Sequence, residues 1–234
     1  MSVQLIDWDL ALIQKYNYSG PRYTSYPTAL EFSPEFGPAE FDAAVARYPQ
    51  RPLSLYVHIP FCHKLCYFCG CNKIVTRQQH KADQYLDVLE QEIIHRAPLF
   101  AGRKVNQLHW GGGTPTYLNK TQISRLMGLL RTHFNFNADA EISIEVDPRE
   151  IELDVLDHLR LEGFNRLSMG VQDFNKEVQR LVNREQDEAF IFALLNHARD
   201  IGFTSTNIDL IYGLPKQTPQ SFAYTLQKVA ELNP

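Results

Sequence analysis

A short strand pattern followed by a helical pattern repeats along most of this chain, and this order constrains the fold more than any other feature. Strand patterns occupy residues 53–59, 105–110, 141–146, 166–171 and 206–212. Apolar residues at helical spacing follow each strand, within residues 80–98, 123–130, 153–159, 187–201 and 218–232. Strands that alternate with helices predict an α/β fold with a parallel sheet and right-handed crossovers.

Two glycines support the repeat. Gly163-Phe164 and Gly202-Phe203 each stand between a helical pattern and the next strand, so we expect both glycines in the left-handed helix-cap position. Five βα units are visible, preceded by an N-terminal arm at 1–51. A sixth strand would be expected where the chain stops, so we expect 52–234 to be an incomplete (β/α)6-type barrel, with the remaining barrel and a C-terminal domain absent.

All the cysteines of the chain lie in one loop, as Cys62, Cys66, Cys69 and Cys71 in a C-x3-C-x2-C-x-C run. Thiolates gathered in this way favour zinc, copper(I) or an iron–sulfur cluster. Disulfides are disfavoured because Asp7, Trp8 and Asp9 stand where a secretory signal would need basic and apolar residues. A structural zinc site usually takes two separated C-x2-C pairs, whereas this run is single and uneven.

Unusual residues stand at or just after the carboxyl end of each strand pattern. They are the cysteine loop, the run Gly111-Gly112-Gly113-Thr114-Pro115, and Glu145, Gln172 and Asp209. Because the carboxyl ends of parallel strands meet at one edge, we expect a ligand site there. Taken singly, each has an ordinary alternative: a tight turn for the glycines, ion pairs for Glu145 and Asp209, and a solvated loop residue for Gln172.

The glycine run lacks the spacing of the known phosphate-binding loops. Backbone without side chains would nevertheless let a ligand approach closely and exchange hydrogen bonds with it. The spacing C-x3-C-x2-C is similar to that of the radical S-adenosylmethionine (radical SAM) enzymes, in which three cysteines hold three irons of a [4Fe–4S] cluster and leave the fourth open. In those enzymes the glycine segment holds the amino group of the cofactor's methionine.

A closer resemblance rests on five segments: Arg22-Tyr23-Thr24-Ser25-Tyr26-Pro27-Thr28-Ala29, Tyr56-Val57-His58-Ile59-Pro60-Phe61-Cys62, His109-Trp110-Gly111-Gly112-Gly113-Thr114-Pro115, Ser168-Met169-Gly170-Val171-Gln172-Asp173 and Asp209-Leu210-Ile211-Tyr212-Gly213-Leu214-Pro215. Together they resemble the oxygen-independent coproporphyrinogen III dehydrogenases. The resemblance implies oxidative decarboxylation of two propionates of coproporphyrinogen III to the vinyl groups of protoporphyrinogen IX, in haem biosynthesis. It covers only the N-terminal part of that family, so we expect a fragment that is inactive alone.

The resemblance also implies roles for individual residues. Cys62, Cys66 and Cys69 would hold the cluster, and Cys71 would be a catalytic non-ligand. A first S-adenosylmethionine would lie among Tyr56, Phe68, Gly112 and Glu145. A second would lie among Gly113, Thr114, Gln172, Arg184 and Asp209. The alternative for Arg184 is a surface ion pair with Asp209 or Glu185.

Two other classes stay open. One is a haem-delivery protein, since relatives of this family that deliver haem share the cluster fold. In that case His58, His63 or His109 would be candidate haem ligands. The other is a zinc-binding interaction domain. A net charge of −4 argues against nucleic acid, and no apolar run reaches the length needed to cross a membrane. We expect a cytoplasmic monomer that takes electrons from a flavodoxin-type donor, with Arg22 of the arm available for a propionate.

Overall fold

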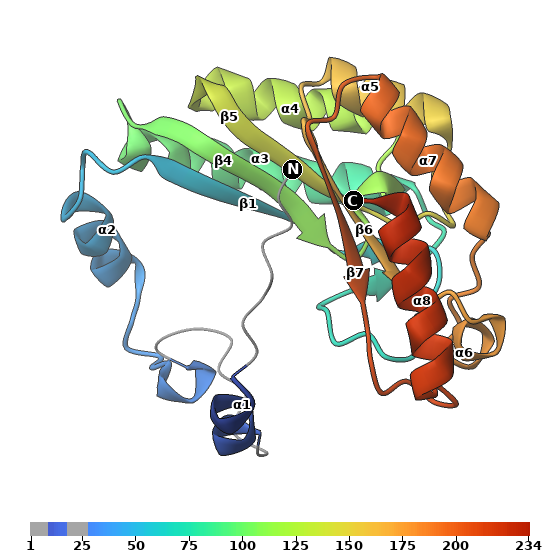
Figure 1. Ribbon diagram of the computed structural model, residues 1–234. Coiled ribbons are helices and arrows are strands. Elements are labelled where there is room, and N and C mark those ends of the chain that lie inside the picture. The colour runs from blue at the N-terminus through green and yellow to red at the C-terminus, as the bar shows by residue number, and fades with distance from the viewer. Residues whose placement is uncertain (1–8, 18–27) are drawn as a thin grey trace. The chain divides into compact units, whose positions relative to one another are not determined.

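The computed structural model describes residues 9–17 and 28–234 and divides into two compact units, residues 1–44 and 45–234 (Figure 1). In the first unit, α1 (Leu10–Tyr16) begins at Asp9, whose carboxylate accepts a hydrogen bond from the Leu12 amide at 2.9 Å. A short 3-10 turn, η1 (Ala29–Glu31), precedes α2 (Pro38–Ala46). Arg22 and the loop through Tyr26 lie outside the described residues, and the domain boundary after residue 51 stays a prediction.

The second unit contains a parallel five-stranded sheet. Its strands are β1 (Leu53–Ile59), β4 (Lys104–Gly112), β5 (Asn135–Val146), β6 (Arg166–Gln172) and β7 (Ser205–Leu210), and they neighbour one another in this order. Each pair of neighbours is parallel. The α/β prediction and its five strands are therefore confirmed. A small parallel pair, β2 (Phe61–Cys62) and β3 (Ile74–Val75), closes the two ends of the cysteine loop.

Helices follow each strand of the five-stranded sheet and cover one face of it (Figure 1). They are α3 (His80–Arg96) with η2 (Ala97–Phe100), η3 (Pro115–Tyr117) with α4 (Lys120–His133), α5 (Leu153–Leu161), α6 (Lys176–Leu181) with α7 (Glu188–Asp200), and α8 (Pro219–Leu232). Gly163 and Gly202 have φ angles of +86° and +94°, so the predicted left-handed turns are confirmed. No helix in the described ranges is long and apolar enough to span a membrane.

Strand β6 shows how the two faces of the sheet differ. Leu167, Met169 and Val171 are fully buried in the core beneath the helices, whereas the alternate positions are only partly buried. In the middle of the core, the ring of Trp110 meets the ring of Phe164 edge-on, with 5.1 Å between centroids. The opposite face of the sheet is polar and carries the side chains that the next section describes.

The structure departs from the predicted elements at several points. Strand β5 begins at Asn135, six residues before the predicted start, because Asn135 and Phe136 pair with Lys104 and Val105 ahead of a register shift. Strand β7 ends at Leu210 and not at residue 212. The short helix α6 was not predicted, since its six residues are too few to show a helical period.

Candidate functional site

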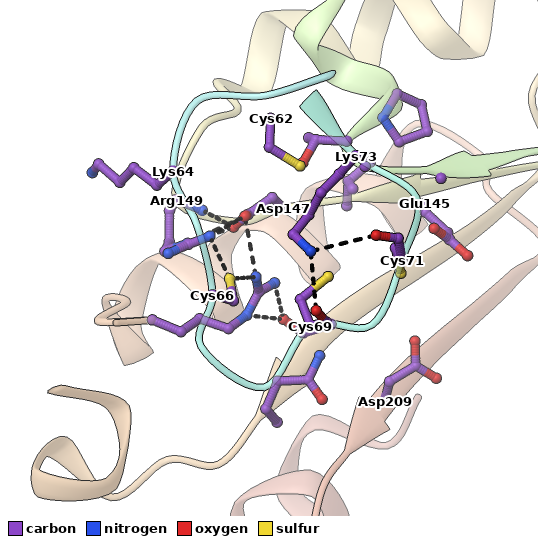
Figure 2. A pocket seen from close by; sticks show the side chains of 18 of the residues that line it. Cys62, Lys64, Cys66, Cys69, Cys71, Lys73, Glu145, Asp147, Arg149 and Asp209 are labelled. Atoms are coloured by element: carbon purple, nitrogen blue, oxygen red, sulfur yellow. Dashed lines mark hydrogen bonds and ion pairs between the residues drawn. The ribbon is translucent and has the colours of Figure 1, made fainter. Parts of the chain in front are cut away.

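The four cysteines line one cavity of about 230 Å³ at the carboxyl ends of the strands (Figure 2). Cys62 and Cys66 are buried, Cys69 is half-buried and Cys71 is exposed. All are free thiols, so the disulfide alternative is not supported. Burial raises the pKa of the Cys62 thiol, and a hydrogen bond from Thr114 Oγ1 to Sγ, at 3.6 Å, partly opposes this.

The cysteine loop is fixed at several points along its length. Thr76 N donates to Cys62 O at 2.9 Å, and Lys73 Nζ donates to Cys69 O at 3.0 Å. On the other side, Asn183 Nδ2 donates to Leu65 O at 2.7 Å. The loop that carries the thiols is therefore held by both the β2–β3 pair and the turn that follows α6.

The glycine run packs directly beneath this loop. A Cβ at Gly112 would lie 2.8 Å from Ile59 O, and one at Gly113 would lie 2.7 Å from Phe61 O. Gly112 also has a φ angle of +122°, which only glycine adopts readily. The run therefore does more than admit a ligand: it lets β4 approach the start of the cysteine loop without a steric clash.

A buried ion-pair cluster borders Cys66. Asp147 accepts from Arg149 Nη2 at 2.6 Å and from Arg184 Nη1 at 3.2 Å. Burial opposes ionisation of Asp147, but the hydrogen bond from Arg149 and the charge of Arg184 outweigh it and hold the pKa of this carboxyl below its ordinary value. Arg184 is only 7% exposed, so the alternative of a surface ion pair with Asp209 or Glu185 is wrong.

Polar side chains from β1, β4 and β5 form a connected group on the open face of the sheet. His109 makes a hydrogen bond with Ser143 Oγ at 2.7 Å and one with Glu145 Oε1 at 3.3 Å. The ring of Tyr56 stacks on that of His109, with 5.9 Å between centroids. Burial, together with the nearby charges of Glu145 and Cys71, raises the pKa of Tyr56.

These contacts bear on the haem-ligand alternative. Both ring nitrogens of His109 are engaged, and those of His58 pair with Tyr56 Oη and Asn72 O, each at 2.9 Å. The ring of His63 lies against that of Tyr117, 4.5 Å between centroids. His58 and His109 are therefore structural partners in this arrangement, which disfavours them as haem ligands.

The cavity gathers every predicted site residue except Tyr56, although their individual roles stay predictions. Its lining includes Cys62, Cys66, Phe68, Cys69, Cys71, Gly112, Gly113, Thr114, Glu145, Gln172, Arg184 and Asp209. Tyr56 lies beside it, on the polar face just described. The sequence interpretation missed the four other charged lining residues: Lys64, Lys73, Asp147 and Arg149. Asp147 and Arg149 come directly after the strand that Glu145 helps to end, so their position was a usable signal.

Three of the thiols, those of Cys62, Cys66 and Cys69, line one cavity. In a [4Fe–4S] cluster each cysteine binds its own iron, so thiols that surround a cavity fit this cofactor. Two guanidinium groups beside Cys66 also suit an anionic, thiolate-bound cluster.

Comparison with known protein families agrees with this geometry. A model of the radical SAM superfamily matches residues 56–229. The fold and the site therefore define a radical SAM protein, a class whose cofactors are a [4Fe–4S] cluster and S-adenosylmethionine.

More specific relatives match all or a large part of the chain. The oxygen-independent coproporphyrinogen III oxidase of Escherichia coli (strain K12) is 89% identical over 234 residues, which are 100% of this chain and 51% of that protein. The protein of that name from Mannheimia haemolytica is 68% identical over 143 residues, 61% of this chain and 98% of that protein. The chain belongs to the oxygen-independent coproporphyrinogen III oxidase family.

A solved structure of coproporphyrinogen III oxidase from Escherichia coli, described as a radical SAM enzyme, superposes with a TM-score of 0.91. It is 86% identical and covers 99% of this chain and 52% of its own. The family and the partial-barrel fold expected from the sequence are thus confirmed. The chain spans about half the length of the curated relatives that match it from end to end.

Proposed function

We propose that this chain supplies the cofactor-binding part of an enzyme that converts coproporphyrinogen III to protoporphyrinogen IX by oxidative decarboxylation of two propionate side chains. The observation that carries the proposal is the cavity in which Cys62, Cys66 and Cys69 meet the glycine run and Glu145. The relatives that match the whole chain are named for oxidation of coproporphyrinogen III.

The cofactors are needed because of the substrate. A propionate C–H group is too weakly acidic for any side-chain base to deprotonate at neutral pH, so the hydrogen must leave as an atom. When bound, the reduced cluster and S-adenosylmethionine supply the 5′-deoxyadenosyl radical that takes this hydrogen. The substrate radical would then lose carbon dioxide and pass one electron to an electron acceptor, which leaves the vinyl group. The protein's part is to hold the cofactors, exclude water and orient the substrate.

We assign the cluster ligands to Cys62, Cys66 and Cys69. Cys71 is exposed and lies on the same cavity, which supports a role near the substrate and not at iron. Lys73 donates to the backbone carbonyls of Cys69 and Cys71, at 3.0 and 3.4 Å, and so holds this end of the loop.

For the first S-adenosylmethionine we assign Tyr56, Phe68, Gly112 and Glu145. Glu145 is partly exposed to the cavity and is held by His109, so its carboxylate is placed to meet a cationic group. Tyr56 would act from beside the cavity through its contact with His109.

For a second S-adenosylmethionine we assign Gly113, Thr114, Gln172, Arg184 and Asp209. Gln172 has a φ angle of +71°, a conformation that costs free energy in a non-glycine residue and often marks a functional position. Arg184 already donates to Asp147, Cys66 and Gly170 O, so only a small part of its guanidinium would remain to bind a cofactor carboxylate.

We propose that the enzyme is a monomer. We also propose that it lies in the cytoplasm, because thiolate ligands need a reducing compartment. A flavodoxin-type protein would supply the electrons.

Anaerobic reconstitution with iron and sulfide tests the cofactor part of this proposal. We expect a brown protein that, with reductant, cleaves S-adenosylmethionine to 5′-deoxyadenosine and methionine. A chimera that joins this chain to the remaining half of the Escherichia coli relative tests the complete reaction, with protoporphyrinogen IX as the expected product. A colourless protein that binds zinc, or a chimera that binds haem stoichiometrically and yields no product, would refute the proposal.

A further inference from the structure

Cys66 has surroundings that set it apart from Cys62. Its Sγ atom accepts two charged hydrogen bonds, from Arg149 Nη2 at 3.2 Å and from Arg184 Nη1 at 3.3 Å (Figure 2). Cys62 Sγ instead accepts from the neutral hydroxyl of Thr114 at the longer distance of 3.6 Å. Positive charge is therefore concentrated on one of the three predicted ligands.

The charges in this cluster do not cancel within it. Two guanidinium groups face the single carboxylate of Asp147, and the side chains of Arg149, Asp147 and Arg184 are only 6%, 8% and 9% exposed. A buried excess of positive charge is costly unless an anion compensates it. The adjacent Cys66 thiolate, as part of an anionic iron–sulfur cluster, is such an anion.

Arg149 is also held in place independently of any ligand. Its Nε donates to Asp147 Oδ1 at 2.9 Å, and its Nη1 donates to Asn183 O at 2.9 Å. Asn183, with a φ angle of +53°, in turn donates to Leu65 O in the cysteine loop. The guanidinium thus has a fixed orientation toward Cys66 and joins the strand end at Asp147 to the turn at Asn183.

We propose that Arg149 is a positioning residue for the iron–sulfur cluster. Its guanidinium fixes the side chain of Cys66 and raises the reduction potential of the cluster. Hydrogen bonds to the sulfurs and nearby net charge are the means by which a protein sets this potential. Reduction brings one electron from the external reductant and makes the site more negative by one charge. A guanidinium hydrogen-bonded to a ligand sulfur stabilises that reduced state more than the oxidised one.

This inference rests on the proposed function, because it takes Cys66 as a cluster ligand. Arg149 is a better subject for the test than Arg184, to which a cofactor-binding role has been assigned above. Arg149→Met removes the charge and the polar contacts with Asp147, Cys66 and Asn183 but keeps much of the buried aliphatic volume. Arg149→Lys keeps the charge but cannot reach Asp147, Cys66 and Asn183 together.

The matched control is Arg125→Met. Arg125 lies on α4 and pairs with Asp87 and Glu90, at 2.8 and 2.6 Å, so this change also removes one paired guanidinium. None of these three residues lines the cavity of the cysteines. The control therefore measures the effect of losing one cation from the protein without altering the contacts of Cys66.

The reconstituted proteins are titrated anaerobically with dithionite, and the reduced cluster is followed by its electron paramagnetic resonance signal alongside the iron content. We expect a midpoint potential that is more negative in Arg149→Met than in Arg125→Met, with Arg149→Lys between Arg149→Met and the parent protein. Equal potentials in Arg149→Met and Arg125→Met, with iron retained in both, would overturn the inference.

If Arg149→Met retains no iron, the potential of Arg149→Lys decides between the outcomes. A midpoint potential of Arg149→Lys equal to that of the parent protein would overturn the inference, and a more negative one would support it. Failure of the parent protein itself to bind a cluster would refute the proposed function. The two failures are therefore distinguishable.

Discussion

Gly113 lies so close to Cys62 that a Cβ at Gly113 would stand 2.9 Å from the cysteine Sγ, nearer than two such atoms can pack. The same Cβ would lie 2.7 Å from the carbonyl oxygen of Phe61, which is backbone and cannot rotate away. The amide of Gly113 meanwhile donates to Ile59 O at 2.8 Å, which fixes the glycine in this position. The end of β4 and the start of the cysteine loop are thus in contact with no spare volume.

Gly113→Ala should therefore destabilise the chain and impair cluster binding. The added methyl group must displace either Cys62 or the Phe61 carbonyl, and overpacking of this kind costs about 1–3 kcal/mol. The measurements are urea unfolding of the cluster-free chain and iron content after reconstitution.

Gly128→Ala is the control for this prediction. Gly128 lies in α4, and a Cβ there would meet no atom within 4 Å apart from its own helix backbone. Alanine at this position should therefore stabilise the helix by about 0.5–1 kcal/mol and leave the iron content unchanged. Equal stability and equal iron content in the two variants would contradict the steric argument.

Single replacements of the cysteines should divide them into two groups. Cys62→Ala, Cys66→Ala and Cys69→Ala should each lose most of the iron after reconstitution, because each removes one predicted ligand. Cys71→Ala should retain it, since Cys71 is exposed and the spacing C-x3-C-x2-C is complete without it. Loss of iron in Cys71→Ala together with its retention in Cys69→Ala would reverse the assignment.

Sequence patterns predicted the strand order of this fold because each strand alternates or runs apolar beneath a helix. They placed β6 within a residue of its observed end, and they placed the left-handed turns at Gly163 and Gly202. Strand β5 was predicted too short. It extends back to Asn135 because its backbone pairs with Lys104 and Val105, and the side-chain pattern of this segment does not show that pairing. Long-range pairing of this kind leaves no local signal in the sequence.

The site was predicted as a collection of strand ends, and the structure brings those residues to one cavity. The buried cluster of Asp147, Arg149 and Arg184 was not predicted as a unit, because residues 149 and 184 are distant in sequence and meet only in the fold, at Asp147 and Cys66. Arg184 even had a surface alternative, which its burial excludes. Charges that pair across the fold cannot be assigned from sequence spacing alone.

Asp147→Asn should destabilise the cluster-free chain at neutral pH and should alter its response to acid. The pKa of Asp147 lies below its ordinary value of 3.8, because Arg149 and Arg184 outweigh the effect of burial. The carboxylate therefore contributes stability that is fully present above pH 3.8 and is lost as the pH falls through the lower folded pKa. Removing one partner of a buried ion pair costs about 3–5 kcal/mol.

The difference in unfolding free energy between parent and Asp147→Asn should be constant from about pH 5 to 7 and should shrink below pH 3.8. Urea unfolding across this range measures it. Asp154→Asn is the control, because its pair with Lys120 is largely exposed and should matter little at any pH. A difference for Asp147→Asn that does not change with pH would show that the carboxylate is not the stabilising charge.

The carboxylate of Glu145 should be the main protein anion for S-adenosylmethionine, with His109 acting through it. Glu145→Gln keeps the size of the side chain but removes its charge, so we expect affinity for the cofactor to fall about tenfold or more, as for the loss of a charge-assisted contact of about 1.5–3 kcal/mol. His109→Phe keeps a ring against Tyr56 but removes the hydrogen bonds to Glu145 and Ser143. Its effect should be smaller and should vanish in the Glu145→Gln background, because the phenyl ring still packs against Tyr56 and the lost hydrogen bond acts on the cofactor through Glu145. Equilibrium dialysis of S-adenosylmethionine against the cluster-loaded proteins measures both effects, and additive losses in the double variant would show that His109 acts independently of Glu145.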